Sequence, residues 1–139
     1  PDLRSRLDGP WIALAKSLPP KARVLDLATG GGYVLGLLIR ERRDLKLIGI
    51  DAAHKLPRRP GLNLRGGVAL DDLPYPAGSF DAVTSRFGIE YGDLTRGANE
   101  AARILRPDGI ARLVVHHAGS NVLRHNRARR EALRWAVHE

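Results

Sequence analysis

The sequence predicts an α/β fold, a parallel β-sheet with helices on both faces. Short apolar runs that suit buried strands alternate with amphipathic segments that suit helices, an alternation typical of parallel sheets. The length of 139 residues and the hydrophobic content of 43% allow one domain, residues 1–139, with a single modest core. Cysteine is absent and no apolar run approaches the roughly 18 residues that cross a bilayer. The composition therefore excludes a disulfide scaffold, and we expect a cytoplasmic protein that does not insert into a membrane.

Residues 1–20 predict an N-terminal helical segment. Apolar side chains recur every three or four positions, as on one face of a helix: Leu3, Leu7, Trp11, Leu14 and Leu18. We expect Gly9 and Pro10 to interrupt this helix, with Pro10 starting a new turn, and Pro19-Pro20 to end it.

The rest of the chain predicts five strands and three further helices. The expected strands are residues 23–28, 45–51, 62–65, 80–85 and 110–116, and the expected helices are residues 33–43, 94–105 and a basic C-terminal helix within 121–139. The second of these helices is expected to begin at an Asp93 cap. Its expected apolar face consists of Leu94, Ala98, Ala101 and Leu105. A turn at Pro107-Asp108-Gly109 should then lead into the fifth strand.

A glycine-rich loop follows the first strand. Gly30, Gly31 and Gly32 stand between that strand and the next helix, where glycine lets backbone N–H groups approach a ligand without a Cβ in the way. The N-terminus of the helix, near Tyr33, carries a partial positive charge that suits a carboxylate or a phosphate. Such loops also serve packing alone, but a position between strand and helix favours a ligand loop.

Asp51 ends the second strand, 21 residues after Gly30. An acidic side chain at that distance accepts hydrogen bonds from ribose hydroxyls. Ala52 and Ala53 behind it leave room for a flat base. The alternative is an aspartate that only caps the following turn. Because ligands bind beyond the carboxyl ends of parallel strands, we expect the site where these two loops meet.

Four stretches of the chain resemble the successive motifs of the class I S-adenosylmethionine-dependent methyltransferases: RVLDLATGGGYVLGLL, LKLIGIDAA, LPYPAGSFDAVTSRFGIEY and AARILRPDGIARLVV. They occur in the family's order and spacing. The resemblance implies a Rossmann-like sheet, with S-adenosylmethionine as the methyl donor and S-adenosylhomocysteine as the product. The LPYPAGSFD stretch is similar to the branch that modifies small molecules, so it implies a small-molecule acceptor.

The resemblance also implies which residues bind the methionine part of the cofactor. In the family, an acid and a run of alternating glycines hold this part. The matching positions are Asp26, Ala28, Thr29, Gly30 and Gly32. Ala28 replaces the usual first glycine, which the backbone tolerates where its φ is negative.

On the adenosine side the resemblance assigns a ribose-binding acid, a position beside adenine and two backbone contacts. These are Asp51, Ala52, Gly67 and Val68, in that order. Many family members also carry an adenine-side aspartate. Its place falls near Ala69 by counting, whereas the acids here are Asp71 and Asp72.

Candidate residues on the acceptor side follow the fourth and fifth strands: Ser85, Phe87, Glu90, Tyr91 and His116. We expect Ser85 and Phe87 beside the methyl donor, with Phe87 as a wall. Glu90, Tyr91 and His116 are the candidates for orienting or deprotonating an acceptor. The alternative is that Phe87 and Tyr91 pack in the core, while Glu90 is a solvated acid and His116 packs at the end of its strand.

Other functions stay open at this point. The net charge of +8, with an arginine-rich C-terminal segment, makes a nucleic-acid methyltransferase an alternative, although the basic residues are scattered rather than clustered. A nicotinamide-dependent oxidoreductase is a second alternative. The glycine loop of that class needs its third glycine one residue earlier than Gly36, the glycine that this chain has, so the match is poorer. A non-catalytic module of the same fold is the third alternative. The histidines show no metal-ligand spacing, so no metal site is expected.

The family fold has seven strands, with an antiparallel pair at its C-terminal end, and only five strands can be placed in this chain. The sequence also lacks Met, even at position 1. We therefore expect a truncated or partly unobserved domain whose fifth strand is an edge, covered by the last helix or by a partner such as a second copy.

Overall fold

The computed structural model describes residues 2–117, 119–121 and 124. Within these residues, five parallel strands form one sheet in the order β3-β2-β1-β4-β5. The strands are β1 (Arg23–Leu27), β2 (Lys46–Ile50), β3 (Leu64–Arg65), β4 (Phe80–Arg86) and β5 (Leu105–Val114). The expected parallel sheet is confirmed. Most of the predicted C-terminal helix within 121–139 lies outside the described residues.

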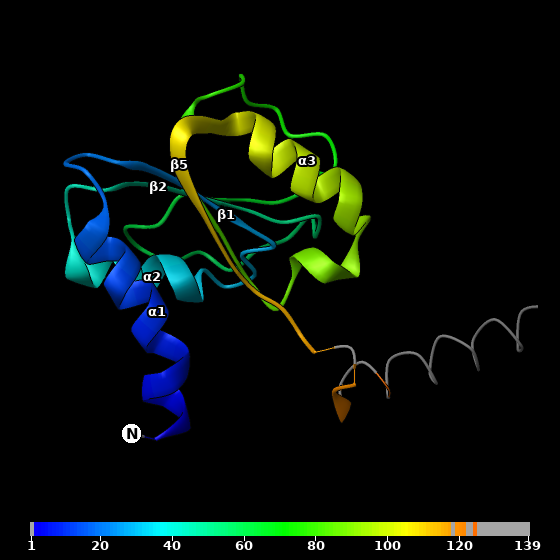
Figure 1. Ribbon diagram of the computed structural model, residues 1–139, viewed down its shortest axis with the longest axis horizontal. Coiled ribbons are helices and arrows are strands. Elements are labelled where there is room, and N and C mark those ends of the chain that lie inside the picture. The colour runs from blue at the N-terminus through cyan, green and yellow to red at the C-terminus, as the bar shows by residue number, and fades with distance from the viewer. Residues whose placement is uncertain (1, 118, 122–123, 125–139) are drawn as a thin grey trace, which may run out of the picture.

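Helices cover both faces of the sheet (Figure 1). On one face lie α1 (Leu3–Ser17) and α2 (Tyr33–Glu41), and on the other lie α3 (Leu94–Ile104) and the short 3-10 helix η1 (Ile89–Tyr91). Side chains alternate between the faces of a strand, so Val24 of β1 packs under α1 and α2 while Leu25 packs under α3. Two aliphatic cores, one on each face, hold the sheet in place.

The strand order creates a switch point between β1 and β4. From β1 the chain moves outward to β2 and β3, then crosses back to the other side of β1 to form β4. The loops that follow β1 and β4 therefore leave the sheet side by side, at the end where open α/β sheets bind ligands.

The first helix continues through Pro10, although Gly9 and Pro10 were expected to interrupt it. Helix α1 runs from an Asp2 cap, whose carboxylate accepts the Ser5 N–H at 2.7 Å, to Ser17 with Pro10 inside it. Proline removes only its own N–H, and the fully buried Trp11 and Leu14 keep the following turns on the sheet. The predicted break was wrong because this packing compensates for one missing hydrogen bond.

Helix α3 starts at Asp93 as predicted, with the Asp93 carboxylate accepting the Arg96 N–H at 3.0 Å. Its buried face differs from the prediction. The side of α3 that faces the sheet consists of Gly97, Ala101 and Ile104, whereas Leu94 is 49% exposed and Ala98 is exposed. A Cβ at Gly97 would lie 3.6 Å from the Ile89 side chain, an ordinary van der Waals distance, so Gly97 faces Ile89 without a glycine being required there. The apolar pattern was misread because glycine carries no hydrophobic signal in a sequence.

Strand β5 begins earlier than predicted and ends at Val114. Leu105 pairs with Phe80, and the next pair joins Ala82 to Ile110, so the intervening residues of β5 bulge out of the ladder. The expected turn Pro107-Asp108-Gly109 lies in this bulge rather than before the strand. A proline without an N–H and a flexible glycine suit such an irregular stretch.

Candidate functional site

The glycine-rich loop after β1 adopts left-handed backbone at three positions. Ala28, Gly30 and Gly32 have φ of 54°, 52° and 76°. Gly32 is the N-cap of α2, and its N–H donates to the Thr29 carbonyl at 2.8 Å. The negative φ under which alanine would be tolerated here is therefore not present. A left-handed alanine costs about 1–2 kcal/mol relative to glycine, and such strain is typical of functional loops.

Asp51 ties the end of β2 to this loop. Its Oδ2 accepts the Gly30 N–H at 2.9 Å, and its Oδ1 accepts the Ala53 N–H at 3.0 Å. The aspartate thus caps the turn that follows it, and it also links this turn to the glycine loop. Each carboxylate oxygen has two lone pairs, and one on each remains for a ligand hydroxyl.

Asp26 lies inside the sheet, on β1, and is 2% exposed. Burial raises the pKa of this carboxyl to about 6, while a hydrogen bond from the Thr84 hydroxyl at 2.7 Å acts in the opposite direction. The side chain titrates near neutral pH, because a buried carboxylate loses the hydration that stabilises its charge.

Two cavities meet at this edge of the sheet. The larger, of about 500 Å³, is lined among others by Ala28, Asp51, Ala52, Ala69, Phe87 and Tyr91. The smaller, of about 150 Å³, is lined among others by Asp26, Ala28, Thr29, Tyr33, Arg86 and Phe87. Ala28 and Phe87 line both, so the two cavities adjoin at the loops that follow β1 and β4.

Four candidates for the acceptor side come together next to the larger cavity: Phe87, Glu90, Tyr91 and His116. Glu90 Oε1 accepts the backbone N–H of His116 at 3.1 Å and lies 2.8 Å from Nδ1 of the same residue. The Tyr91 hydroxyl lies 3.4 Å from that Nδ1, and Phe87 stacks on the imidazole with ring centroids 4.5 Å apart. A carboxylate so placed holds the proton on Nδ1 and leaves Nε2 as an acceptor.

Of these residues, Phe87 and Tyr91 line the larger cavity, whereas Glu90 and His116 do not. Tyr91 is 56% exposed, so it does not pack in the core. The Glu90 side chain is 10% exposed and is not a solvated acid. The four side chains therefore form one cluster at the edge of the larger cavity.

Other predicted residues are engaged within the protein. The Ser85 hydroxyl donates to the Leu27 carbonyl at 2.9 Å and accepts the Ile89 N–H at 3.2 Å, and Ser85 is fully buried. The N–H groups of Gly67 and Val68 donate to the carbonyls of Ala53 and Asp51, both at 3.0 Å. These residues shape the loops around the cavity, and their donors are used inside the fold.

Three residues at the site had not been singled out from the sequence for it. Asp71 lines the larger cavity, and Tyr33 and Arg86 line the smaller one. Arg86 carried a signal, since it is a charged residue at the carboxyl end of a buried strand. Tyr33 had none beyond its position at the start of α2.

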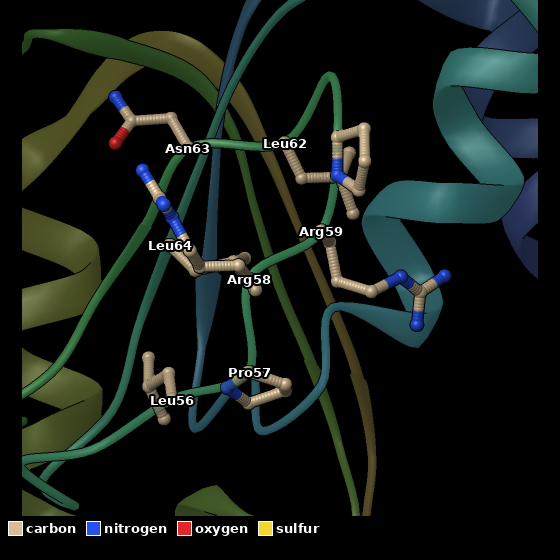
Figure 2. A pocket seen from close by; sticks show the side chains of 8 residues that line it. Leu56, Pro57, Arg58, Arg59, Leu62, Asn63 and Leu64 are labelled. Carbon is tan, nitrogen blue, oxygen red and sulfur yellow. The ribbon is translucent and has the colours of Figure 1, made fainter.

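A third hollow, of about 610 Å³, lies beside β3 (Figure 2). The coil that connects β2 to β3 forms it, with Leu56, Arg58, Leu62 and Leu64 around it and Arg59 reaching toward α2. The Arg59 guanidinium donates to the Gly31 carbonyl at 3.1 Å. Arg59 therefore supports the glycine loop from outside. The hollow shares no lining residue with the two cavities described above.

The described part of the chain contains no helix that is both long and apolar enough to cross a membrane. Nor do its His, Asp and Glu side chains form a group of three or more that could hold a metal ion.

The sheet order, the glycine loop and the aspartate at the end of β2 define an α/β protein of the Rossmann-like type. Comparison with known proteins identifies the family: a family model described as a methyltransferase domain matches residues 2–139. The chain belongs to this methyltransferase family.

Individual relatives agree with the family. The chain is 40% identical to the demethylmenaquinone methyltransferase of Thermus thermophilus over 125 residues, which cover 82% of the chain and 54% of that protein. It is 34% identical over 99 residues to the malonyl-[acyl-carrier protein] O-methyltransferase of Methylococcus capsulatus, covering 66% of the chain and 36% of that protein. The crystal structure of YcgJ from Bacillus subtilis superposes with a TM-score of 0.71 at 26% identity, covering 85% of the chain and 54% of YcgJ. The match spans about half the length of the Thermus thermophilus protein and about a third of the length of the Methylococcus capsulatus protein.

Proposed function

We propose that the protein is an S-adenosylmethionine-dependent methyltransferase that acts on a small molecule. The observation that carries this proposal is Asp51, which lines a cavity of about 500 Å³. Its Oδ2 accepts the Gly30 N–H of the glycine loop and its Oδ1 accepts the Ala53 N–H, and each oxygen keeps a lone pair that a ribose hydroxyl could use. Family membership supports the same activity.

The residues around the two cavities fit the parts of this cofactor. Asp51 would accept hydrogen bonds from the ribose hydroxyls, and Ala52 and Ala69 would flank the adenine in the larger cavity. Asp71, in the same cavity, would accept from the exocyclic amino group of adenine. The glycine loop and Asp26 would hold the methionine part in the smaller cavity.

The bound cofactor supplies a methyl group on a positively charged sulfur, which already carries a good leaving group. The protein then needs mainly to align the acceptor with that methyl group and to exclude water. Phe87 lines both cavities and would form the wall between cofactor and acceptor. Tyr91, half exposed at the larger cavity, would contact the acceptor, and the Glu90–His116 pair would accept its proton where the acceptor is protonated.

The identity of the acceptor follows from the relatives only as a class. The names of those relatives give demethylmenaquinone and a malonyl group on an acyl-carrier protein as their acceptors. We therefore propose an acceptor that is a small molecule or a small acyl group carried by a protein. A nucleic-acid acceptor stays an alternative with weaker support. The cytoplasmic location and the homodimer expected from the sequence stay predictions.

The test combines calorimetry with an assay of methyl-donor consumption over a panel of metabolites. We expect S-adenosylhomocysteine to bind and NAD not to bind. Asp51→Asn places a donor nitrogen where the carboxylate accepts, so S-adenosylhomocysteine affinity should fall at least about tenfold, since a charge-assisted hydrogen bond contributes roughly 1.5–3 kcal/mol.

Asp44→Asn is the control, because Asp44 is an aspartate bonded to Arg42 and the Lys21 N–H, away from the cavities. This variant should bind S-adenosylhomocysteine as the wild type does. NAD binding by the wild type, or unchanged affinity in Asp51→Asn, would contradict the proposed function.

A further inference from the structure

Arg86 lies in the smaller of the two cavities and has no acidic partner among the described residues. It ends β4 and lines the smaller cavity together with Asp26 and Thr29. None of the carboxylates in the described part of the chain lies within ion-pair distance of its guanidinium, and its buried Nε–H has no hydrogen-bond acceptor there. A buried donor without an acceptor costs roughly 1–3 kcal/mol, so this arrangement is unusual for a purely structural arginine.

Two aromatic rings hold the guanidinium in place. Its Cζ lies 4.4 Å from the centroid of Tyr33 and 5.6 Å from that of Phe87. The Tyr33 hydroxyl is fixed by Asp8 of α1 at 2.9 Å, and the Phe87 N–H donates to the Val114 carbonyl at 2.7 Å. Both rings are therefore anchored to separate elements, so the arginine is oriented before any ligand arrives.

Contact with the faces of rings uses the charge of a guanidinium and leaves its N–H donors free in the plane of the group. That planar fork matches the two oxygens of a carboxylate. Asp26 lines the same cavity but makes no ion pair with Arg86, which leaves space between the two charges.

We propose that Arg86 is a carboxylate-binding residue of this site, an inference that rests on the proposed function. Two sources supply a carboxylate here: the amino-acid end of the cofactor, or an acidic acceptor. Both place a bidentate ion pair on Arg86, and they differ in which ligand loses affinity when the arginine is replaced.

The experiment uses the full chain and titration calorimetry, with binding rather than activity as the readout. The first pair of probes is S-adenosylhomocysteine and 5′-methylthioadenosine, which has the same nucleoside and thioether but no amino-acid end. The second pair is benzoate and the neutral benzamide, titrated into protein saturated with S-adenosylhomocysteine.

Arg86→Met removes the charge of the side chain, and Arg86→Lys keeps the charge but loses the planar fork of N–H donors. Arg43→Met is the matched control, because Arg43 is an exposed arginine just after α2 and lines neither cavity.

A cofactor carboxylate on Arg86 predicts a loss of about tenfold or more in S-adenosylhomocysteine affinity in Arg86→Met, with 5′-methylthioadenosine unchanged. An acceptor carboxylate predicts that both nucleosides bind unchanged, while the preference of the wild type for benzoate over benzamide disappears. In either case Arg86→Lys should retain only part of the effect, and Arg43→Met should behave as the wild type.

Equal affinities of the wild type and Arg86→Met for all four probes, with circular dichroism showing a retained fold, would overturn the inference. Where Arg86→Met does not fold, Arg86→Lys decides: carboxylate binding as tight as in the wild type would overturn the inference as well. Failure of the wild type to bind either nucleoside would instead overturn the proposed function, so the two failures are distinguishable.

Discussion

Asp26 makes the stability of the protein depend on pH in an unusual direction. Its carboxyl has a pKa of about 6 in the folded state, raised by burial from the ordinary 3.8. Between these two values the folded state holds a proton that the unfolded state lacks, so the free energy of unfolding falls as the pH rises through this window. At neutral pH the charged group therefore costs about 3 kcal/mol relative to its neutral form.

Asp26→Asn should remove this cost while keeping an oxygen that accepts from Thr84. We expect a free energy of unfolding higher by about 1–3 kcal/mol at neutral pH and no gain below about pH 4, measured by urea denaturation. Asp44→Asn is the opposite case, because the Arg42 guanidinium lowers the pKa of Asp44. The Asp44 charge stabilises the fold above its unfolded pKa, so this variant should lose stability at neutral pH. A loss of stability in Asp26→Asn at neutral pH would show that the charged form is favoured in the fold.

The same buried carboxylate couples to the ligand. A positively charged cofactor beside Asp26 favours its ionised form, so affinity for S-adenosylmethionine should rise as the pH increases through about 6. This dependence should disappear in Asp26→Asn.

The Glu90–His116 pair sets the acceptor-side chemistry. Glu90→Gln replaces the acceptor of the His116 Nδ1 proton with an amide and should weaken the imidazole as a base. With an acceptor found in the metabolite panel, the methyl-transfer rate should fall by about 10² or more, with a shifted pH profile and unchanged S-adenosylhomocysteine affinity. Unchanged rate and pH profile would assign the pair a structural role.

At the scale of single residues, the sequence predicted which strand ends carry the site but not all of its contacts. Asp51 and Tyr91 line the larger cavity and His116 lies beside Tyr91, as expected where parallel strands end at one edge of the sheet. The positive φ of Ala28 was not predicted from the sequence. The ring contacts of Arg86 likewise join segments that no local pattern relates.

At the scale of elements, the loops after β1 and β4 touch at Gly88. A Cβ on Gly88 would collide with the Cβ of Ala28, whereas a Cβ on Gly92, a few residues further on, meets open space. Gly88→Ala must therefore push the two loops apart at the junction of the cavities. We expect a loss of about 1–3 kcal/mol in the free energy of unfolding and weaker S-adenosylhomocysteine binding.

Gly92→Ala makes the same chemical change in the same segment and should leave the free energy of unfolding within about 0.5 kcal/mol of the wild type. Gly92 lines the larger cavity, so it serves as the control for stability alone. Thermal denaturation of the two variants gives the comparison. Equal stability for Gly88→Ala and Gly92→Ala would mean that the loops are not in the contact described here.

The elements themselves were predicted well where periodicity is strong and less well where packing decides. Strands β1 and β2 and helix α2 lie within two residues of their predicted bounds. Helix α3 presents a face containing Gly97, and β5 absorbs Pro107-Asp108-Gly109 as a bulge. Both features arise from packing between elements, which side-chain hydrophobicity does not record.

At the scale of the whole molecule, the excess of positive charge lies mainly outside the site. The net charge is +8, yet the two cavities are lined by four acids, Asp26, Asp51, Asp71 and Asp93, and by one basic residue, Arg86. Arg43 and Arg58, in contrast, face outer hollows beside α2 and β3. A distribution of this kind attracts polyanions to the surface without directing them into the site.

This separation predicts that nucleic acid and cofactor respond differently to salt. Binding of a single-stranded RNA of about 20 nucleotides should weaken at least tenfold between about 50 and about 200 mM salt, because it depends on counterion release. S-adenosylhomocysteine affinity should change little over the same range. The double variant Arg43→Met/Arg58→Met should weaken RNA binding further and leave S-adenosylhomocysteine binding unchanged. RNA binding that is as tight at the higher salt, and that competes with S-adenosylhomocysteine, would favour a nucleic-acid acceptor over a small molecule. In that case only contacts inside the site would hold the RNA.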